Sequence, residues 1–480
     1  MRMIKIANLV SVVLMTGCSV FPQYTKPVIK TAETWQASMP HDGNVANLMD
    51  WWAQFNDPAL NQMLQAAQAD SPTLDKAMAN IKSARANVTT AQAQALPSIT
   101  GSASANRSKG SSGSVNAGSS AGGATTTITG ALDAAWEIDL FGGIKFSKQA
   151  AQARLEAKQA DWHLARVSLA AEVASDYVSY RACELSVAAY VKALDSKKET
   201  LRLTAILANA GFSAPADAAL AEASMRASES TLIAQKTQCD VTVKSLVALT
   251  NLPEQNLRAL LANQAGIPKP AQLNISSVPA DLLTQRPDLV MDERNLAAAS
   301  ADVGIATADR YPTFSLLGSI GRRRIDSSGV SVSSNTWSFG PSISVPIFDA
   351  GQRKAEVTKA EANYEIALAN YQQDVRSAVK EVEQALVNLE SANQREKAER
   401  ISQEQYAKYY QAAEINWRAG GVSLLSLEDA RRQMINAEIN QINQQQNQVQ
   451  YWIALYKALG GGWQEKQATS PKNNTENEAK

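Results

Sequence analysis

Glycine and proline, the residues that most often interrupt regular structure, are absent from two long stretches of the chain. Neither residue occurs in 144–210 or in 352–419. At roughly 1.5 Å per residue, each run is long enough for a helix of about 100 Å. Each run ends at a glycine, Gly211 or Gly420, and a second uninterrupted run follows it. The pattern predicts an internal repeat of two helical hairpins with matching dimensions.

The second long run also carries a heptad pattern of apolar residues. One series is Leu368, Val375, Val382 and Leu389, and an interlocking series is Tyr364, Tyr371, Ala378 and Ala385. This spacing is typical of a coiled-coil packing seam. Many seam positions are alanine, which lets helix axes approach closely and suits the packing of several helices into a wall. A free-standing dimeric coiled coil is the alternative interpretation of the same periodicity.

The segment before each long run has a period of two. Apolar and polar residues alternate over residues 127–140 and 337–347, and each segment has a possible hairpin partner upstream, 97–107 or 312–324. These are four strands of about ten residues, the length of a tilted transmembrane strand. Four strands do not close a barrel, and lipid does not tolerate an open sheet edge. Several chains must therefore share one barrel, unless the strands form a soluble sheet with one wet face.

Charge and composition exclude several functional classes. The chain has 46 Lys and Arg against 46 Asp and Glu, and no basic run, so a nucleic-acid partner is not expected. Two histidines and three scattered cysteines form no metal-ligand pattern, and no phosphate loop or nucleophile elbow is present. We therefore expect neither an enzyme nor a cofactor.

The amino terminus has the layout of an export signal. Two positive charges in residues 1–5 precede an apolar stretch, and Thr16, Gly17 and Cys18 follow. A cysteine at this place resembles a bacterial lipobox, in which the cysteine becomes lipid-modified and forms the new amino terminus. A plain signal peptide with an incidental Cys18 thiol is the alternative. No later run of about 20 apolar residues offers a transmembrane helix, so any membrane crossing must use strands.

The other two cysteines are placed symmetrically about the first hairpin tip. Cys183 precedes Gly211 and Cys239 follows it, at equal distances along the chain. In an antiparallel hairpin, equal distances from the turn place residues opposite each other, and an exported protein experiences an oxidising compartment. We expect a structural Cys183–Cys239 disulfide, with two buried free thiols as the alternative.

Several motifs, in order and spacing, resemble the outer-membrane factor family of tripartite (RND-type) efflux pumps, in its OprM/NodT lipoprotein branch, related to TolC. The matching residues are Trp51-Trp52, Phe55, Asp57-Pro58, Leu96-Pro97-Ser98, Arg286-Pro287-Asp288-Leu289, Tyr311-Pro312 and Phe348-Asp349-Ala350-Gly351-Gln352-Arg353. The resemblance implies a mixed α and β membrane protein, a trimer with four strands per chain in a 12-stranded outer-membrane β-barrel. That barrel would be continuous with a 12-helix periplasmic α-barrel built from two internal repeats.

The resemblance also implies a gate at the second hairpin tip. In the family, a leucine and an aspartate at the corresponding helix start form constricting rings, and these match Leu425 and Asp429. A spacing of four residues puts both on one helix face. The charged latch of the TolC branch is not carried over, because this chain has Val422 and Ser426 at two of its positions. The alternative is that Leu425 is a core residue and Asp429 a solvated helix residue.

The function expected from the resemblance is a passive exit duct for small molecules such as drugs. Its partners would be two further copies of the chain, a periplasmic adaptor (membrane fusion) protein, an inner-membrane RND-type transporter and outer-membrane lipid. The protein would be lipid-anchored in the bacterial outer membrane and extend into the periplasm. A conduit for protein secretion and a periplasmic coiled coil without a pore are the alternatives.

These inferences divide the chain into eight segments. In order they are a signal peptide (1–17), a lipid-anchored segment with two helices (18–96), the first β-hairpin (97–141), the first helical hairpin (143–252), an equatorial segment with a connecting helix (253–311), the second β-hairpin (312–348), the second helical hairpin (351–460) and a disordered tail (461–480).

Overall fold

The structure is a computed structural model, and it describes residues 24–27, 29, 51–52, 54–109, 124–269, 286–327 and 330–461. The predicted signal peptide, Cys18 and residues 462–480 of the predicted tail lie outside the described residues. The chain divides into two compact units, and each is described by itself. Unit 1 comprises Met1–Val28, Ala79–Gln159 and Met291–Tyr371, and unit 2 comprises Ile29–Met78, Ala160–Val290 and Gln372–Lys480.

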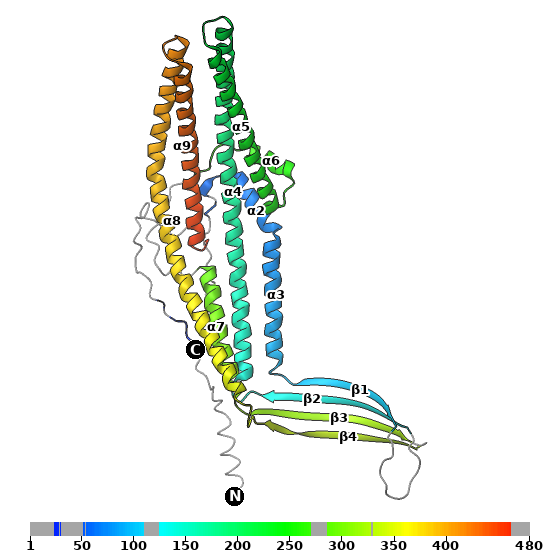
Figure 1. Cartoon of the computed structure of the whole chain (residues 1–480). Helices are drawn as coiled ribbons and strands as arrows, with labels where there is room; N and C mark the ends of the chain where they lie inside the picture. Colours follow the sequence, from blue (N-terminus) through cyan, green and yellow to red (C-terminus); the bar gives the residue numbers. More distant parts are fainter. Residues whose placement is uncertain are drawn as a thin grey trace, which may run out of the picture. The chain divides into compact units, whose positions relative to one another are not determined.

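Unit 1 contains one four-stranded sheet (Figure 1). Its strands are β1 (Ser98–Ser108), β2 (Thr125–Ile138), β3 (Thr313–Ser327) and β4 (Val330–Ser344). They pair in sequence order, and all three pairings are antiparallel. Within one chain, the outer edges of β1 and β4 therefore have no strand partner among the described residues, as expected for a sheet that neighbouring chains complete.

Towards the strand ends that adjoin the helices, one face of the sheet is apolar. Leu132 on β2 lies opposite Ile320 on β3, which in turn lies opposite Trp337 on β4, and all three side chains are exposed. The intervening residues, such as Asp133 and Ser319, are polar and point to the other face. This part of the face exposes large apolar side chains and is suited to contact with lipid, whereas Arg322 and Arg324 occupy the same face further along β3.

β1 and β2 have the predicted lengths of 11 and 14 residues, whereas β3 and β4, with 15 residues each, are longer than the sequence pattern predicts. The largest difference is at β4, which begins at Val330 and so well before the predicted start at Trp337. Val330 and Val332 pair with Ser327 and Ile325 of β3, and they lie on the sheet face opposite to Trp337, so they do not continue the apolar series of that residue. The serine-rich composition of this stretch resembles a loop, and only the pairing with β3 identifies it as strand.

Glycines with positive φ stand where the strands give way to the long helices. Gly142 has φ +86° and precedes α4 (Gly143–Asn209), and Gly351 has φ +89° and precedes α8 (Gln352–Arg418). Such backbone angles favour glycine. Asp349 accepts hydrogen bonds from the N–H groups of Gly351 and Arg353 at 3.0 and 3.2 Å. Both glycines thus provide backbone angles that most residues avoid at the junction of a strand and a long helix.

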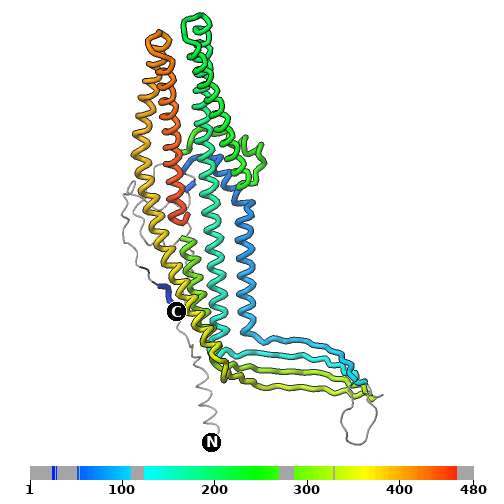
Figure 2. Tube along the Cα trace, in the orientation of Figure 1, coloured from blue at the N-terminus to red at the C-terminus, as the bar shows by residue number. Residues whose placement is uncertain are grey.

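Two helical hairpins follow from the internal repeat. α4 pairs with α5 (Pro215–Thr250), and α8 pairs with α9 (Leu424–Ala458), as Figure 2 traces. The tips have matching geometry: Gly211 has φ +79° and Gly420 has φ +76°. At each tip an N–H group reaches back to a carbonyl of the preceding helix at 2.8 Å, from Phe212 to Leu207 and from Gly421 to Asn416. Most of the predicted α8 seam is buried, namely Tyr371, Val375, Ala378, Val382, Ala385 and Leu389.

The shorter helices are α2 (Pro58–Ala69), α3 (Pro72–Ala93), α6 (Glu254–Ala262) and α7 (Pro287–Ala308). Asp57 caps α2 by accepting hydrogen bonds from the N–H groups of Ala59 and Leu60 at 2.9 and 3.1 Å. Ser71 caps α3 by accepting one from Leu74 at 3.4 Å. Both caps precede a proline, which fits the first turn of a helix. None of the helices in the described part of the chain is both long and apolar enough to cross a membrane.

An aromatic core holds the amino-terminal segment of unit 2 against α9. The rings of Trp51 and Trp452 have centroids 3.8 Å apart, and Phe55 lies edge-on to Trp452 at 5.2 Å. Asp57 also accepts a hydrogen bond from the hydroxyl of Tyr177 on α4. These buried contacts explain why the tryptophan and Asp-Pro motifs occur together near the start of the chain.

Candidate functional site

The tip of the second hairpin is built by local sequence. Gly420 turns the chain after α8, and Ser423 caps α9 by accepting a hydrogen bond from the N–H group of Ser426 at 3.2 Å. α9 therefore begins at Leu424, and this start fixes the face of the helix on which each following residue lies. It thereby decides which of the next side chains are buried and which face outward.

Leu425 is the leucine of this tip that points outward. Its side chain is 66% exposed, whereas Leu424 and Leu427 are 7% and 0% exposed. The two buried leucines pack with Ala430 and with Tyr410 of α8. Leu425 thus lies off the packed face of α9 and is available for contacts beyond its own hairpin.

Asp429 lies one helical turn after Leu425. Its carboxylate forms an ion pair with Arg432 and accepts a hydrogen bond from Nε2 of Gln433 at 2.6 Å. Leu425 and Asp429 both line one groove of about 800 Å³ within unit 2, together with residues of α4, α5 and α8. The structure therefore brings the two predicted gate residues together on one exposed surface.

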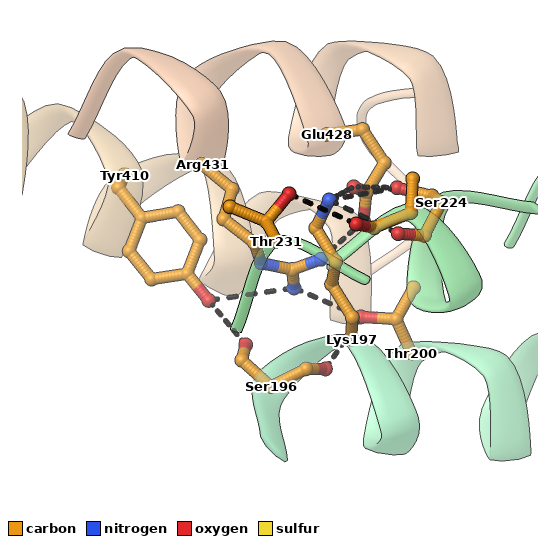
Figure 3. Close-up of polar contacts among 9 residues, drawn as sticks. Ser196, Lys197, Thr200, Ser224, Thr231, Tyr410, Glu428 and Arg431 are labelled. Atoms are coloured by element: carbon orange, nitrogen blue, oxygen red, sulfur yellow. Dashed lines mark hydrogen bonds and ion pairs between the residues drawn. The ribbon is translucent and has the colours of Figure 1, made fainter. Parts of the chain in front are cut away.

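A buried polar network lies next to this surface, and the sequence pattern does not predict it (Figure 3). At its centre is Arg431, whose side chain is 1% exposed. Its guanidinium forms an ion pair with Glu428 and donates a hydrogen bond to the Thr200 hydroxyl of α4 at 2.8 Å. The same guanidinium lies 5.5 Å from the centre of the Tyr410 ring. Arg431 thus joins three helices through one side chain.

Glu428 extends the network to the second helix of the first hairpin, α5. Its carboxylate accepts a hydrogen bond from the Ser224 hydroxyl of α5 at 2.8 Å and lies 3.6 Å from Nζ of Lys197 on α4. Lys197 also donates to the Ser224 hydroxyl at 2.9 Å. Two cations therefore hold one partly buried carboxylate, and all four helices of the two hairpins contribute to the arrangement.

The sequence indicates the ion pairs of this network but not the burial of one of them. Residues 428–432 read Glu-Asp-Ala-Arg-Arg, which places two acid–base pairs at a spacing of three residues on adjacent faces of α9. The outer pair is Asp429–Arg432 and the inner pair is Glu428–Arg431. Burial of the inner pair depends on Lys197 and Thr200, which belong to the other repeat and lie far away in the sequence, so local pattern alone does not reveal it.

The two hairpin cysteines are adjacent in the structure. Cys183 on α4 and Cys239 on α5 are joined as a disulfide, with a sulfur–sulfur distance of 2.00 Å and a Cα–Cα distance of 5.6 Å. Both side chains are buried. Their place on facing helices follows from their equal distances to Gly211. Cys18, the predicted lipidation site, lies outside the described residues.

Comparison with known proteins identifies the family of the chain. A model of the outer membrane efflux protein family matches residues 63–252 and 278–461. The chain belongs to the outer membrane efflux protein family. The match covers both helical hairpins and both β-hairpins. Among the described residues, no three His, Cys, Asp or Glu side chains are grouped so as to hold a metal ion.

Individual members of the family match nearly the whole chain. The solvent efflux pump outer membrane protein SrpC of Pseudomonas putida is 29% identical over 470 residues, which cover 94% of this chain and 97% of SrpC. The toluene efflux pump outer membrane protein TtgI, also of Pseudomonas putida, matches with the same figures. The structure of the outer-membrane channel OprN has a TM-score of 0.81 at 31% identity, and the match covers 93% of this chain and 100% of OprN.

The fold class predicted from the sequence is therefore confirmed. Each chain of this outer membrane efflux protein supplies four strands and two long helical hairpins to a trimeric channel. The protein is the outer-membrane exit duct of a tripartite efflux pump. The open edges of β1 and β4 are the edges that neighbouring chains complete in such a trimer.

Proposed function

We propose that Leu425 and Asp429 of three chains form the gate of this exit duct. The supporting observation is the exposure of Leu425 beside two buried leucines, because a residue kept out of its own core is free to meet its symmetry mates. Threefold symmetry gives a ring of three leucines, which narrows the passage and disfavours water within it. It also gives a ring of three carboxylates one turn away, which favours cations.

The Arg431 network holds this gate closed. Glu428 and Arg431 lie on the same helix turns as Asp429, and they tie α9 to Thr200, Lys197 and Ser224 of the first hairpin. A buried ion pair that loses one partner leaves an uncompensated charge, which is strongly unfavourable. Displacement of α9 from the first hairpin therefore requires replacement contacts, which the docking of a partner protein can supply.

The partners of the duct are a periplasmic adaptor protein and an inner-membrane RND-type transporter. The duct itself is passive, and the energy for transport enters at the inner-membrane transporter. Its cargo consists of small, apolar molecules such as drugs and solvents, in keeping with the solvent and toluene pumps to which SrpC and TtgI belong. A wide, water-filled passage discriminates little between small molecules, so the cargo is selected before it enters the duct.

The mature chain is anchored to lipid through Cys18. Tyr24, a short distance further on, donates a hydrogen bond from its hydroxyl to Oε1 of Glu293 on α7 at 2.7 Å. An extended chain spans at most about 3.6 Å per residue, so an anchor at Cys18 is tethered within about 22 Å of Tyr24. Tyr24 and the sheet belong to the same unit. The proposed anchor is thus tethered to the unit that carries the strands.

Single-channel conductance in planar bilayers tests the gate. Leu425→Ala and Asp429→Ala should each raise conductance, because they widen the leucine ring or remove the carboxylate ring. Phe212→Ala is the matched control, since Phe212 is an apolar residue at the first hairpin tip and is 83% exposed. The control should conduct like the unaltered protein. Unchanged conductance in both gate variants would refute the assignment.

The pump assignment is tested in cells. Crosslinking of membranes followed by purification should recover the trimer with an adaptor and an inner-membrane transporter, and deletion of the gene should increase accumulation of a small apolar dye. Recovery with a protein-secretion transporter, together with unchanged dye accumulation, would favour the secretion conduit instead.

A further inference from the structure

Unit 1 contains a groove whose chemistry the duct function does not explain. It has a volume of about 610 Å³ and lies between α3, α4 and α7, at the end of these helices that adjoins the sheet. Its floor is apolar and includes the buried residues Ile144, Phe146 and Ala301. Two exposed lysines at its rim, Lys145 and Lys148, stand on the first turns of α4.

The two lysines are not neutralised by the carboxylates that share the groove. Asp139 accepts a hydrogen bond from the backbone N–H of Lys145 at 2.7 Å. Glu156 accepts one from Arg294 at 3.0 Å and one from Gln152 at 2.9 Å. Among the described residues, neither lysine ammonium group has an acidic partner. The rim therefore presents two unpaired positive charges above an apolar floor.

Two contacts connect the groove with the apolar series of β2 and with the segment that follows the proposed lipid anchor. Trp136 belongs to the apolar series of β2, and its indole N–H donates a hydrogen bond to the carbonyl of Ala95 at 3.1 Å. Ala95 lines the groove. Tyr24, which is tethered to the proposed lipid anchor, lines it as well. The groove is thus linked through Ala95 to the apolar series of β2, and through Tyr24 to the segment that follows the proposed lipid anchor.

Aromatic residues mark the level of the membrane surface here. Phe141, which lies between Trp136 and Lys145 in the sequence, stacks on Tyr311, which lies between α7 and β3, with ring centroids 4.8 Å apart. Aromatic side chains form girdles at the membrane–water boundary of outer-membrane barrels. Positive charges just beyond such a girdle are at the depth of lipid headgroups.

We propose that the groove binds an anionic phospholipid of the periplasmic leaflet, with its phosphate between Lys145 and Lys148 and an acyl chain on the apolar floor. The proposal rests on the outer-membrane placement of the sheet. It does not depend on the proposed gate. Charge complementarity selects the headgroup, and the apolar floor selects a lipid over a free anion.

Native mass spectrometry of the delipidated trimer tests the proposal with added phosphatidylglycerol. Exchange of both lysines, Lys145→Gln with Lys148→Gln, should weaken binding about 30-fold, or roughly fivefold for each lysine. Both side chains are exposed, so the variant should keep its fold. Lys354→Gln is the matched control, because Lys354 is the third residue of α8 as Lys145 is of α4, and it does not line the groove.

Two further arms identify the ligand. Phosphatidylethanolamine, which carries no net charge, should bind more weakly than phosphatidylglycerol, and inorganic phosphate at the same concentration should not displace bound lipid. Added salt should weaken binding to the unaltered protein more than to the double variant. Equal binding by the double variant and the unaltered protein would overturn the proposal, as would displacement of the lipid by inorganic phosphate.

Discussion

The two helical hairpins have the same geometry, yet they are fastened differently at equivalent positions. Cys183 and Cys239 flank the tip glycine of the first hairpin at equal distances along the chain. Ala392 and Gln448 occupy the same places about Gly420 in the second. There, Nε2 of Gln448 donates a hydrogen bond to Oδ1 of Asn393 at 2.6 Å. The first hairpin therefore has a covalent bridge where the second has an amide hydrogen bond.

The same contrast extends to the tips. The second hairpin carries Leu425, Asp429 and the Arg431 network, whereas the first offers the hydroxyl and ammonium groups that the network binds. The helices of the first hairpin are thus joined by a covalent bond, whereas the second hairpin is held by noncovalent contacts, which can break and reform. We expect the difference in fastening to match a difference in motion.

The largest effect should come from removal of the disulfide. It closes a loop with a sequence separation of 56 residues, for which chain entropy gives about 4 kcal/mol as an upper value. Cys183→Ser with Cys239→Ser should therefore lower the thermal midpoint, and addition of reductant to the unaltered protein should do the same. If reductant leaves the midpoint unchanged, the first hairpin is not held covalently in the purified protein.

The second effect concerns the buried network of the second hairpin. Arg431→Ala leaves Glu428 without its nearest cation, which should cost about 3 kcal/mol of local stability. Hydrogen exchange at the first turns of α9 should accelerate by about two orders of magnitude. Arg226→Ala is the control, because Arg226 pairs with Glu222 and Glu229 on the exposed surface of α5. Equal acceleration in both variants would mean that the network does not hold α9.

A smaller effect is the pH dependence of stability, which we expect from a histidine of the first hairpin that the second hairpin lacks. Burial, and then the nearby charge of Arg166, lowers the pKa of His163 on α4 to about 4. In the unfolded chain this residue is protonated below a pH of about 6.5. The contribution of neutral His163 to the free energy of unfolding is therefore complete above that pH and is lost as the pH falls towards about 4. The loss should be about 2 kcal/mol after allowance for partial exposure. His163→Gln copies Gln372 of the second repeat and should remove this slope from thermal melts.

The smallest effect is expected where a single amide hydrogen bond is removed. Gln448→Ala should destabilise the second hairpin by about 1 kcal/mol, measured by the thermal midpoint or by hydrogen exchange. A loss as large as that of the disulfide variant would show that the amide bond fastens the second hairpin as firmly as the bridge fastens the first, and the proposed contrast would be wrong.

Much of the fold is readable from the sequence because its signals are local. Missing glycine and proline define α4 and α8, the tip glycines define the turns, and Asp57-Pro58 defines the start of α2. The start of β4 is not readable in this way, because its serine-rich beginning is recognisable only through its pairing with β3. The Arg431 network escapes prediction for a related reason, since its partners Lys197 and Thr200 belong to the other repeat.

The distance between symmetry-related copies of the two tips tests the central contrast most directly. Spin labels at position 425 and, separately, at position 212 should be measured in the trimer with and without Arg431→Ala. We predict that the distances between the three labels at 425 lengthen by about 5 Å or more, the scale of a one-turn helix displacement, while those at 212 stay the same. Equal displacement at both positions, or none at 425, would contradict a fixed first hairpin and a moving, gate-bearing second hairpin.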